Sequence, residues 1–230
     1  MWANWAVTTT NTSTTANFDR GAMRTALSLA RRGLGSVWPN PAVGCVLVGN
    51  GRVVGRGWTQ PGGRPHAEAE ALGRAGAAAR GATVYVTLEP CAHHGKTPPC
   101  ANALIDAGIA RVVVACTDPD PRVDGGGLKL LEKAGCEVVT GVCEQEALAL
   151  NAGFFSTLAR DRPLVTIKTA TTLDGRIATR TGESQWITGG DARARGHLLR
   201  ATHDAIMVGS GTVRSDNPEL TCRLPGMMDR

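Results

Sequence analysis

The 230-residue sequence has few aromatic side chains and no long apolar run. Aromatic residues make up 4%, with one tyrosine and three phenylalanines, so the core must rely on small and aliphatic side chains. No apolar run approaches the roughly 18 to 20 residues that a membrane-spanning helix needs. The first 17 residues have neither the basic start nor the apolar middle of a signal peptide, and their Thr and Asn content predicts a disordered tail. We therefore expect a protein that acts without a membrane.

A concentration of charge of one sign is also lacking. The net charge is +5, but residues 1–160 carry 15 basic and 12 acidic side chains and residues 161–230 carry 10 and 8, so the excess is spread along the chain. Because there is no basic run or aromatic-basic strip, we expect no nucleic-acid partner.

The seven cysteines are an odd number and give no sign of a disulfide framework. Cys45, Cys116 and Cys136 lie within apolar, strand-like runs, where a free cysteine behaves as a small buried hydrophobic residue. This usage is typical of a reducing compartment, and it predicts a cytoplasmic protein.

The sequence does contain a regular alternation of helical and strand-like segments. Two β-branched runs flank Asn50-Gly51, a dipeptide favoured in two-residue hairpin turns. From there to about residue 140, helical periodicity alternates with short apolar runs. The alternation predicts an α/β fold with a largely parallel sheet and helices on both faces.

A second, shorter α/β unit is predicted to follow a helix over about 144–159. It begins near residue 163, continues through a helix near 191–201 and reaches a strand over 203–211. The boundary between the two units is expected near 155–162, where the sequence ARDRP breaks the pattern.

His66, Cys91 and Cys100 are residue types that zinc prefers as ligands, and each stands at the predicted start of a helix or the end of a strand. Three protein ligands leave a fourth position for water, as in catalytic zinc sites, whereas a closed structural site would need a fourth ligand. Zinc lowers the pKa of a bound water to about 7. Glu68, which is not needed as a ligand, can take a proton from that water and pass it to a leaving amine.

Less specific interpretations remain open for these residues. Cys91 and Cys100 could form a disulfide, and His66 alone could be a hydrogen-bonded residue at a helix start. His93 and His94, in the loop between the cysteines, could compete as ligands or line a substrate entrance. A zinc-stabilised binding module without activity is a rival of another class, but it would have no use for Glu68 beside an open coordination position.

The His-x-Glu and Pro-Cys pattern matches the signature of zinc-dependent base deaminases. Longer stretches carry a narrower likeness: VWPNPAVGCVLV, RPHAEAEAL, LEPCAHHGKTPPC, KTATTLDGRIAT, GESQWIT and SDNPELTCR. Through them the chain resembles the bifunctional riboflavin-biosynthesis deaminase/reductase family. The eight-residue spacer between Cys91 and Cys100 separates this family from the cytidine and transfer-RNA adenosine deaminases, which usually have two residues there.

The resemblance implies a cytidine-deaminase-like three-layer α/β/α sandwich over residues 18–160. It implies that residues 161–230 are the start of a dihydrofolate-reductase-like α/β domain. The implied ligands of Zn²⁺ are His66, Cys91 and Cys100, with Glu68 as the catalytic proton shuttle. A nucleoside or transfer-RNA base deaminase is the alternative.

The implied substrate is a small molecule, 2,5-diamino-6-ribosylamino-4(3H)-pyrimidinone 5′-phosphate, deaminated to 5-amino-6-(5-phosphoribosylamino)uracil. Asn40 matches the family's ring-recognising asparagine, or it is a turn residue between two prolines. Lys96 is a candidate for the phosphate, or a solvated loop cation. Two positions depart from the family pattern: Thr59, where many members carry histidine, and Asp120, where many carry asparagine.

For residues 161–230 the resemblance implies an NADP(H)-dependent reductase site. Without it, Trp186 would be read as a core residue and Arg200 as a helix-surface charge. Residues 163–230 number 68, which is too few for a complete dinucleotide-binding fold, so we expect the reduction to be lost or impaired in a chain that is either a fragment or naturally shortened. The sequence leaves a homo-oligomer open. The implied cofactor residues are Ala170, Trp186, Thr212 and Asp216, and the implied substrate residues are Ser184, Arg200, Leu220 and Arg223.

Overall fold

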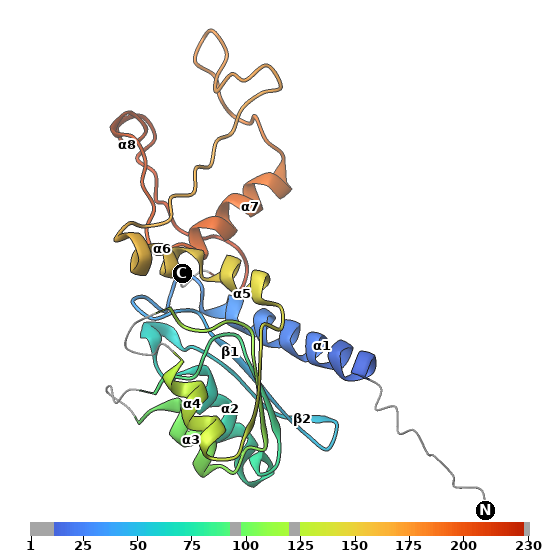
Figure 1. Cartoon of the computed structure of the whole chain (residues 1–230). Helices are drawn as coiled ribbons and strands as arrows, with labels where there is room; N and C mark the ends of the chain where they lie inside the picture. Colours follow the sequence, from blue (N-terminus) through green and yellow to red (C-terminus); the bar gives the residue numbers. More distant parts are fainter. Residues whose placement is uncertain (1–11, 93–97, 120–124, 228–230) are drawn as a thin grey trace, which may run out of the picture.

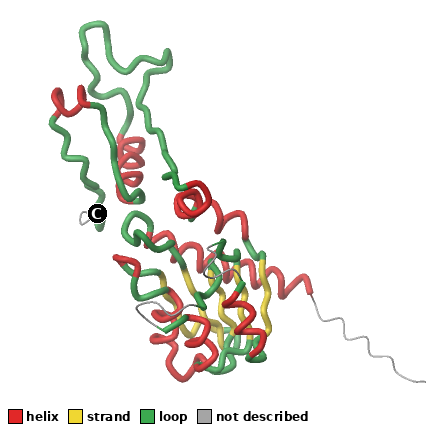
Figure 2. Tube along the Cα trace, turned by 60° about the vertical axis from the view of Figure 1, so that its left-hand side comes forward, coloured by secondary structure: helices red, strands yellow, loops and turns green. Residues whose placement is uncertain are grey.

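The computed structural model describes residues 12–92, 98–119 and 125–227. All of its strands lie in the part of the chain before residue 160 (Figures 1 and 2). The described residues beyond that point form loops and two helices. None of the described helices is both long and apolar enough to cross a membrane.

A five-stranded sheet in the order β2-β1-β3-β4-β5 forms the centre of the fold. The hairpin predicted around Asn50-Gly51 is confirmed: both residues have positive φ, 50° and 71°, as a tight two-residue turn requires. The strands are β1 (Gly44–Gly49), β2 (Arg52–Trp58), β3 (Thr83–Val86), β4 (Arg111–Val114) and β5 (Glu137–Thr140).

The prediction of a largely parallel sheet is correct only for β3, β4 and β5, which are parallel to one another. β1 is antiparallel to both of its neighbours, β2 and β3. The tight turn makes β1 and β2 run in opposite directions. The strand order then places β1 between β2 and β3, so that β1 runs against both of its neighbours.

Helices cover both faces of the sheet, so the predicted three-layer α/β/α sandwich is confirmed (Figure 1). On one face, α1 (Thr12–Ala30) packs against β1, β2 and β3 and contacts α5 (Glu144–Leu150). On the other face, α2 packs against β1 and β2, and α3 lies between α2 and α4. The bounds of these three helices are Ala67–Ala75, Cys100–Asp106 and Gly126–Lys133.

Two sequence predictions about helix limits need correction. Residues 12–17, predicted within a disordered tail, belong to α1. Phe18, edge-on to Tyr85, and the buried Asp19 anchor this helix. Residues 12–17 contain no proline or glycine that would interrupt the helix on the N-terminal side of Phe18. The single helix predicted over 144–159 is instead α5 and α6 (Ala152–Arg160), separated at Asn151.

In the last part of the chain, the helix predicted near 191–201 is confirmed as α7 (Gly190–Ala201). The strand predicted over 203–211 is wrong, because Ser210 and Gly211 begin α8 (Ser210–Asp216) and the residues before them are irregular. An extended segment becomes a strand only when a neighbour supplies ladder hydrogen bonds, and none of the described residues pairs with this one. Met207 is accordingly 92% exposed.

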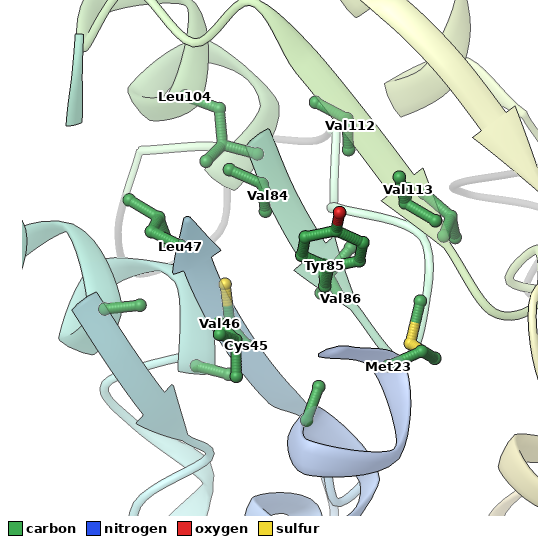
Figure 3. Close-up of a cluster of buried hydrophobic side chains, with 14 of the residues drawn as sticks. Met23, Cys45, Val46, Leu47, Val84, Tyr85, Val86, Leu104, Val112 and Val113 are labelled. Atoms are coloured by element: carbon green, nitrogen blue, oxygen red, sulfur yellow. The ribbon is translucent and has the colours of Figure 1, made fainter. Parts of the chain in front are cut away.

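Successive side chains along the strands point to opposite faces of the sheet, and the strand register aligns them in rows. Tyr85 is paired with Val46 on one side and Val113 on the other, and this row faces α1, whose Met23 lies beside it (Figure 3). Val84 is paired with Leu47 and Val112 in a row that faces α3 and its Leu104 (Figure 3). Both faces of β1, β3 and β4 are buried, which explains the continuous apolar runs of these three strands.

One buried ion pair connects α1 to the sheet. Arg111 donates to both carboxylate oxygens of Asp19 at 2.9 Å, and the Tyr85 hydroxyl donates to Asp19 Oδ1 at 2.7 Å. Burial alone would raise the pKa of Asp19, but the hydrogen bonds from Arg111 and Tyr85 outweigh it and lower that pKa. Arg111 also pairs with Glu137, which is exposed.

We expect Asp19→Asn to destabilise the protein by about 1–3 kcal/mol at pH 7, because it removes a charged acceptor of three hydrogen bonds. Since the pKa of folded Asp19 lies below its ordinary value of 3.8, its contribution is present above that pH and is lost as the pH falls through the folded pKa. The difference from the wild type should therefore shrink in acid. Urea unfolding of both proteins at pH 7 and below pH 4 measures it.

Glu137→Gln is the matched control, because it removes the exposed partner of the same arginine. It should cost less than about 1 kcal/mol. A larger effect from Glu137→Gln than from Asp19→Asn would contradict the assignment of the buried pair.

Candidate metal centre

Three side chains from separate segments converge at one end of the sheet. His66 immediately precedes α2, Cys91 follows β3 within a few residues, and Cys100 is the first residue of α3. The ligand atoms of the three residues lie within 4.8 Å of one another. His66 Nδ1 is 3.3 Å from the sulfur of Cys100 and 3.8 Å from that of Cys91.

These distances and donors fit a zinc ion. Tetrahedral angles and ordinary Zn–N and Zn–S bond lengths place neighbouring donors about 3.6 Å apart. The donor set contains one imidazole and two thiols, and all seven cysteines are free, so Cys91 and Cys100 form no disulfide here. The site can therefore offer three protein ligands to one ion.

Close packing of α2 on the hairpin holds His66 in place. A side chain at Gly57 of β2 would have its Cβ 2.3 Å from the carbonyl oxygen of Ala67, the first residue of α2. Only glycine permits this approach of strand and helix. This contact fixes the backbone of α2 at Ala67 relative to β2, and with it the position of the preceding residue, His66.

The two thiols differ strongly in acidity. Hydrogen bonds from Cys100 and His66 lower the pKa of Cys91 to about 4, while burial acts in the opposite direction. Its sulfur also accepts the backbone N–H of Cys100 at 3.3 Å. The hydrogen bond with Cys91 is the largest cause that raises the pKa of Cys100, and burial raises it further. The lowered pKa of Cys91 favours its thiolate, which is the form that binds a metal.

Glu68 lies in the first turn of α2, two residues after His66, and is 4% exposed. Burial raises its pKa to about 7, and the nearby His66 offsets part of that shift. A carboxyl group with this pKa can both accept and release a proton near neutral pH.

The Asn40 side chain lies beside the ring of His66. Its Nδ2 donates to the carbonyl of Gly63 at 2.7 Å and lies 3.4 Å from His66 Nε2, the ring nitrogen that faces away from the thiols. Asn40 therefore lies beside a proposed metal ligand, and its side chain is held by a hydrogen bond to Gly63; its role in recognising a substrate ring stays a prediction.

Two residues anchor the loop that carries Asn40. The buried Thr59 hydroxyl accepts the N–H of Val43 at 2.9 Å and lies 3.1 Å from the carbonyl of Pro41. The buried Asn151 side chain accepts the N–H of Ala42 and donates to its carbonyl, both at 2.9 Å. Thr59 therefore serves the backbone of this loop. Asn151 was missed because nothing in the local sequence distinguishes it from a helix residue.

Other expected site residues fall outside the described part of the chain. Lys96, His93 and His94 lie in the gap at 93–97, and Asp120 lies in the gap at 120–124. Their roles stay predictions.

A concavity of about 580 Å³ lies in the last part of the chain. Trp186 is 71% exposed there, which excludes the alternative of a core residue, and the guanidinium of Arg193 lies 4.6 Å from its ring centre. Arg200 Nη1 lies 2.9 Å from His197 Nδ1. Of the eight cofactor and substrate residues expected in this region, only Leu220 is not part of the lining, which includes Ala170, Ser184, Trp186, Arg200, Thr212, Asp216 and Arg223.

Comparison with known proteins gives two family matches, one to the earlier part of the chain and one to its last part. Residues 16–116 match the cytidine and deoxycytidylate deaminase zinc-binding region, and residues 163–230 match the RibD C-terminal domain. The riboflavin biosynthesis protein RibD of Aquifex aeolicus is 52% identical over 205 residues, which are 89% of this chain and 58% of that protein. The chain is thus a relative of the RibD proteins, similar to this one over about nine-tenths of its own length.

Other RibD proteins are similar to the chain over a comparable length. That of Escherichia coli is 51% identical over 89% of this chain and 56% of its own length. The crystal structure of a diaminohydroxyphosphoribosylaminopyrimidine deaminase/5-amino-6-(5-phosphoribosylamino)uracil reductase from Thermotoga maritima superposes with a TM-score of 0.87 at 44% identity, over 93% of this chain and 61% of that one. The chain thus spans little more than half the length of the curated RibD relatives that it matches.

We expect the purified chain to hold about one zinc ion, and the double variant Cys91→Ala/Cys100→Ala to hold almost none, since one imidazole is a poor zinc site. Elemental analysis after dialysis measures both. Cys143→Ala, which removes a half-buried thiol elsewhere, is the control and should keep its zinc. Undiminished zinc in the double variant would refute the assignment of the ligands.

Proposed function

We propose that the chain catalyses the hydrolytic deamination of 2,5-diamino-6-ribosylamino-4(3H)-pyrimidinone 5′-phosphate to 5-amino-6-(5-phosphoribosylamino)uracil, a step of riboflavin biosynthesis. The observation that carries the proposal is a buried carboxyl group, Glu68, beside three convergent zinc donors. The likeness to RibD proteins over nine-tenths of the chain supports the choice of substrate.

In this proposal His66, Cys91 and Cys100 hold the metal and Glu68 moves protons. When bound, zinc supplies a Lewis acid that makes a water more acidic. Glu68 takes the proton of the attacking water and delivers it to the departing amine, so that the water oxygen replaces the nitrogen and ammonia leaves. The pKa of about 7 suits a group that must do both in one turnover. The low pKa of Cys91 favours the thiolate that the metal needs.

Substrate recognition is assigned to the loop of Asn40 and to Lys96. The Asn40 amide lies beside His66 and is oriented by Gly63, so it can offer hydrogen bonds to a pyrimidine ring held near the metal. Lys96, from the loop between the two cysteines, is proposed to bind the 5′-phosphate. His93 and His94 of the same loop are proposed to line the entrance.

Residues 18–160 are proposed as the deaminase domain and residues 161–230 as part of a reductase domain. In the latter, the 580 Å³ concavity gathers residues proposed to bind NADP(H) and substrate. Its arginines suit phosphate groups, because a guanidinium forms paired hydrogen bonds with them. Leu220, outside the lining, keeps its assignment to substrate only by resemblance. We also propose a cytoplasmic location, which the seven free cysteines favour.

An ammonia-release assay with three substrates tests the function. We expect release from the diaminopyrimidinone phosphate and none from cytidine or a transfer-RNA stem-loop. The dephosphorylated pyrimidine should react poorly, because Lys96 would lose its partner. Release from cytidine or RNA alone would instead establish a nucleoside or transfer-RNA base deaminase.

Glu68→Gln should keep the fold and the zinc but lower kcat about 10²- to 10⁴-fold, since an amide cannot carry the proton. Ammonia release and zinc content, measured on the same preparation, give the result. Glu70→Gln is the matched control: it makes the same change two residues further along α2, where the carboxylate pairs with Arg74 at 2.9 Å. Loss of zinc in Glu68→Gln would make Glu68 structural instead.

A further inference from the structure

Glu89 is a second buried carboxyl group near the metal centre, and the proposed chemistry does not use it. It is 4% exposed and stands two residues before Cys91. Its backbone N–H donates to the carbonyl of Cys116, beyond the end of β4, at 3.0 Å. The main chain leading to the first thiol is thus already tied to the neighbouring strand's continuation.

The Glu89 side chain is held by backbone donors from two other segments. Oε1 accepts the N–H of Gly127 at 3.0 Å and that of Leu128 at 3.4 Å, both in the first turn of α4. Oε2 accepts the N–H of Asp118 at 3.3 Å. These three donors compensate for burying a carboxylate, and two of them belong to a helix N-terminus, which favours negative charge.

The first turn of α4 lies directly against the residue that follows Glu89. A Cβ at Gly127 would be 1.9 Å from the carbonyl oxygen of Pro90, so only glycine allows this approach. The segment that leads to Cys91 is therefore enclosed by α4 on one side and joined to it by the Glu89 carboxylate. Displacing either contact must move the backbone that carries the Cys91 sulfur.

We propose that Glu89 is a positioning residue for the zinc ligand Cys91. Its carboxylate joins the chain after β3, the chain after β4 and the start of α4, and so fixes the direction in which the Pro90-Cys91 backbone leaves the sheet. This inference rests on the proposed function in that Cys91 must be a metal ligand. Glu89 itself touches neither the metal nor the substrate.

Glu89→Gln tests the proposal with little change in volume. The amide can still accept from α4, but its NH₂ group then faces the N–H of Asp118, and the negative charge is lost. Metal-site partners of this kind typically contribute about 10- to 100-fold to metal affinity or activity. We expect zinc to transfer to a colorimetric chelator at least about tenfold faster than from the wild type.

The cobalt-substituted holoprotein gives a reading that does not depend on turnover. We expect Glu89→Gln to shift its thiolate charge-transfer and d–d absorption bands, because the Cys91 sulfur moves relative to the ion. Glu132→Gln, the same change at an exposed position of α4, should leave the spectrum and zinc release unchanged. Ammonia assays should show a lower kcat with little change in KM.

A purely structural role is separated from positioning by the same measurements. If Glu89→Gln lowers the free energy of unfolding while the cobalt spectrum and zinc release stay as in the wild type, the proposal is overturned. If this variant does not fold, Glu89→Asp, which keeps the charge but shortens the reach, takes its place with the same readings. A wild type that binds zinc but deaminates no pyrimidine would refute the proposed function and leave this inference standing.

Discussion

The packing of α2 on the β1–β2 hairpin is the contact on which the site depends. It requires glycine at Gly57, because the strand backbone comes against the carbonyl of Ala67. That approach sets the first turn of α2, and with it both His66 and Glu68. The proposed metal ligand and the proposed proton carrier are therefore placed by one close contact between a strand and a helix.

The other half of the centre is arranged by backbone hydrogen bonding around β3 and β4. These strands are parallel, so their continuations lie at the same edge of the sheet, where Cys91, Asp118 and the start of α4 meet. The buried carboxylate of Glu89 joins these segments. Across the site, Thr59 and Asn151 hold the loop of Asn40 through its main chain. The reacting groups thus stand on a support built largely from backbone contacts.

The last part of the chain is organised differently from the sheet. It gathers a basic concavity around Trp186 and Arg200, yet its described residues form no strand, and apolar side chains such as Ile167 remain 83% exposed. Strand formation needs a partner, whereas helices satisfy their hydrogen bonds internally. This explains why the helix near 191–201 could be predicted from its sequence while the strand over 203–211 could not.

The sequence by itself determined the elements that depend on local chemistry: the Asn50-Gly51 turn, the alternation of helices and strands, and the spacing of His66, Glu68, Cys91 and Cys100. It also carried the likeness that indicated the three-layer fold. Only the tertiary structure decided the antiparallel placement of β1, the helical state of residues 12–17, and the roles of Asn151 and Glu89. These depend on which distant backbone groups a strand or a buried side chain meets, and no local pattern records such pairings.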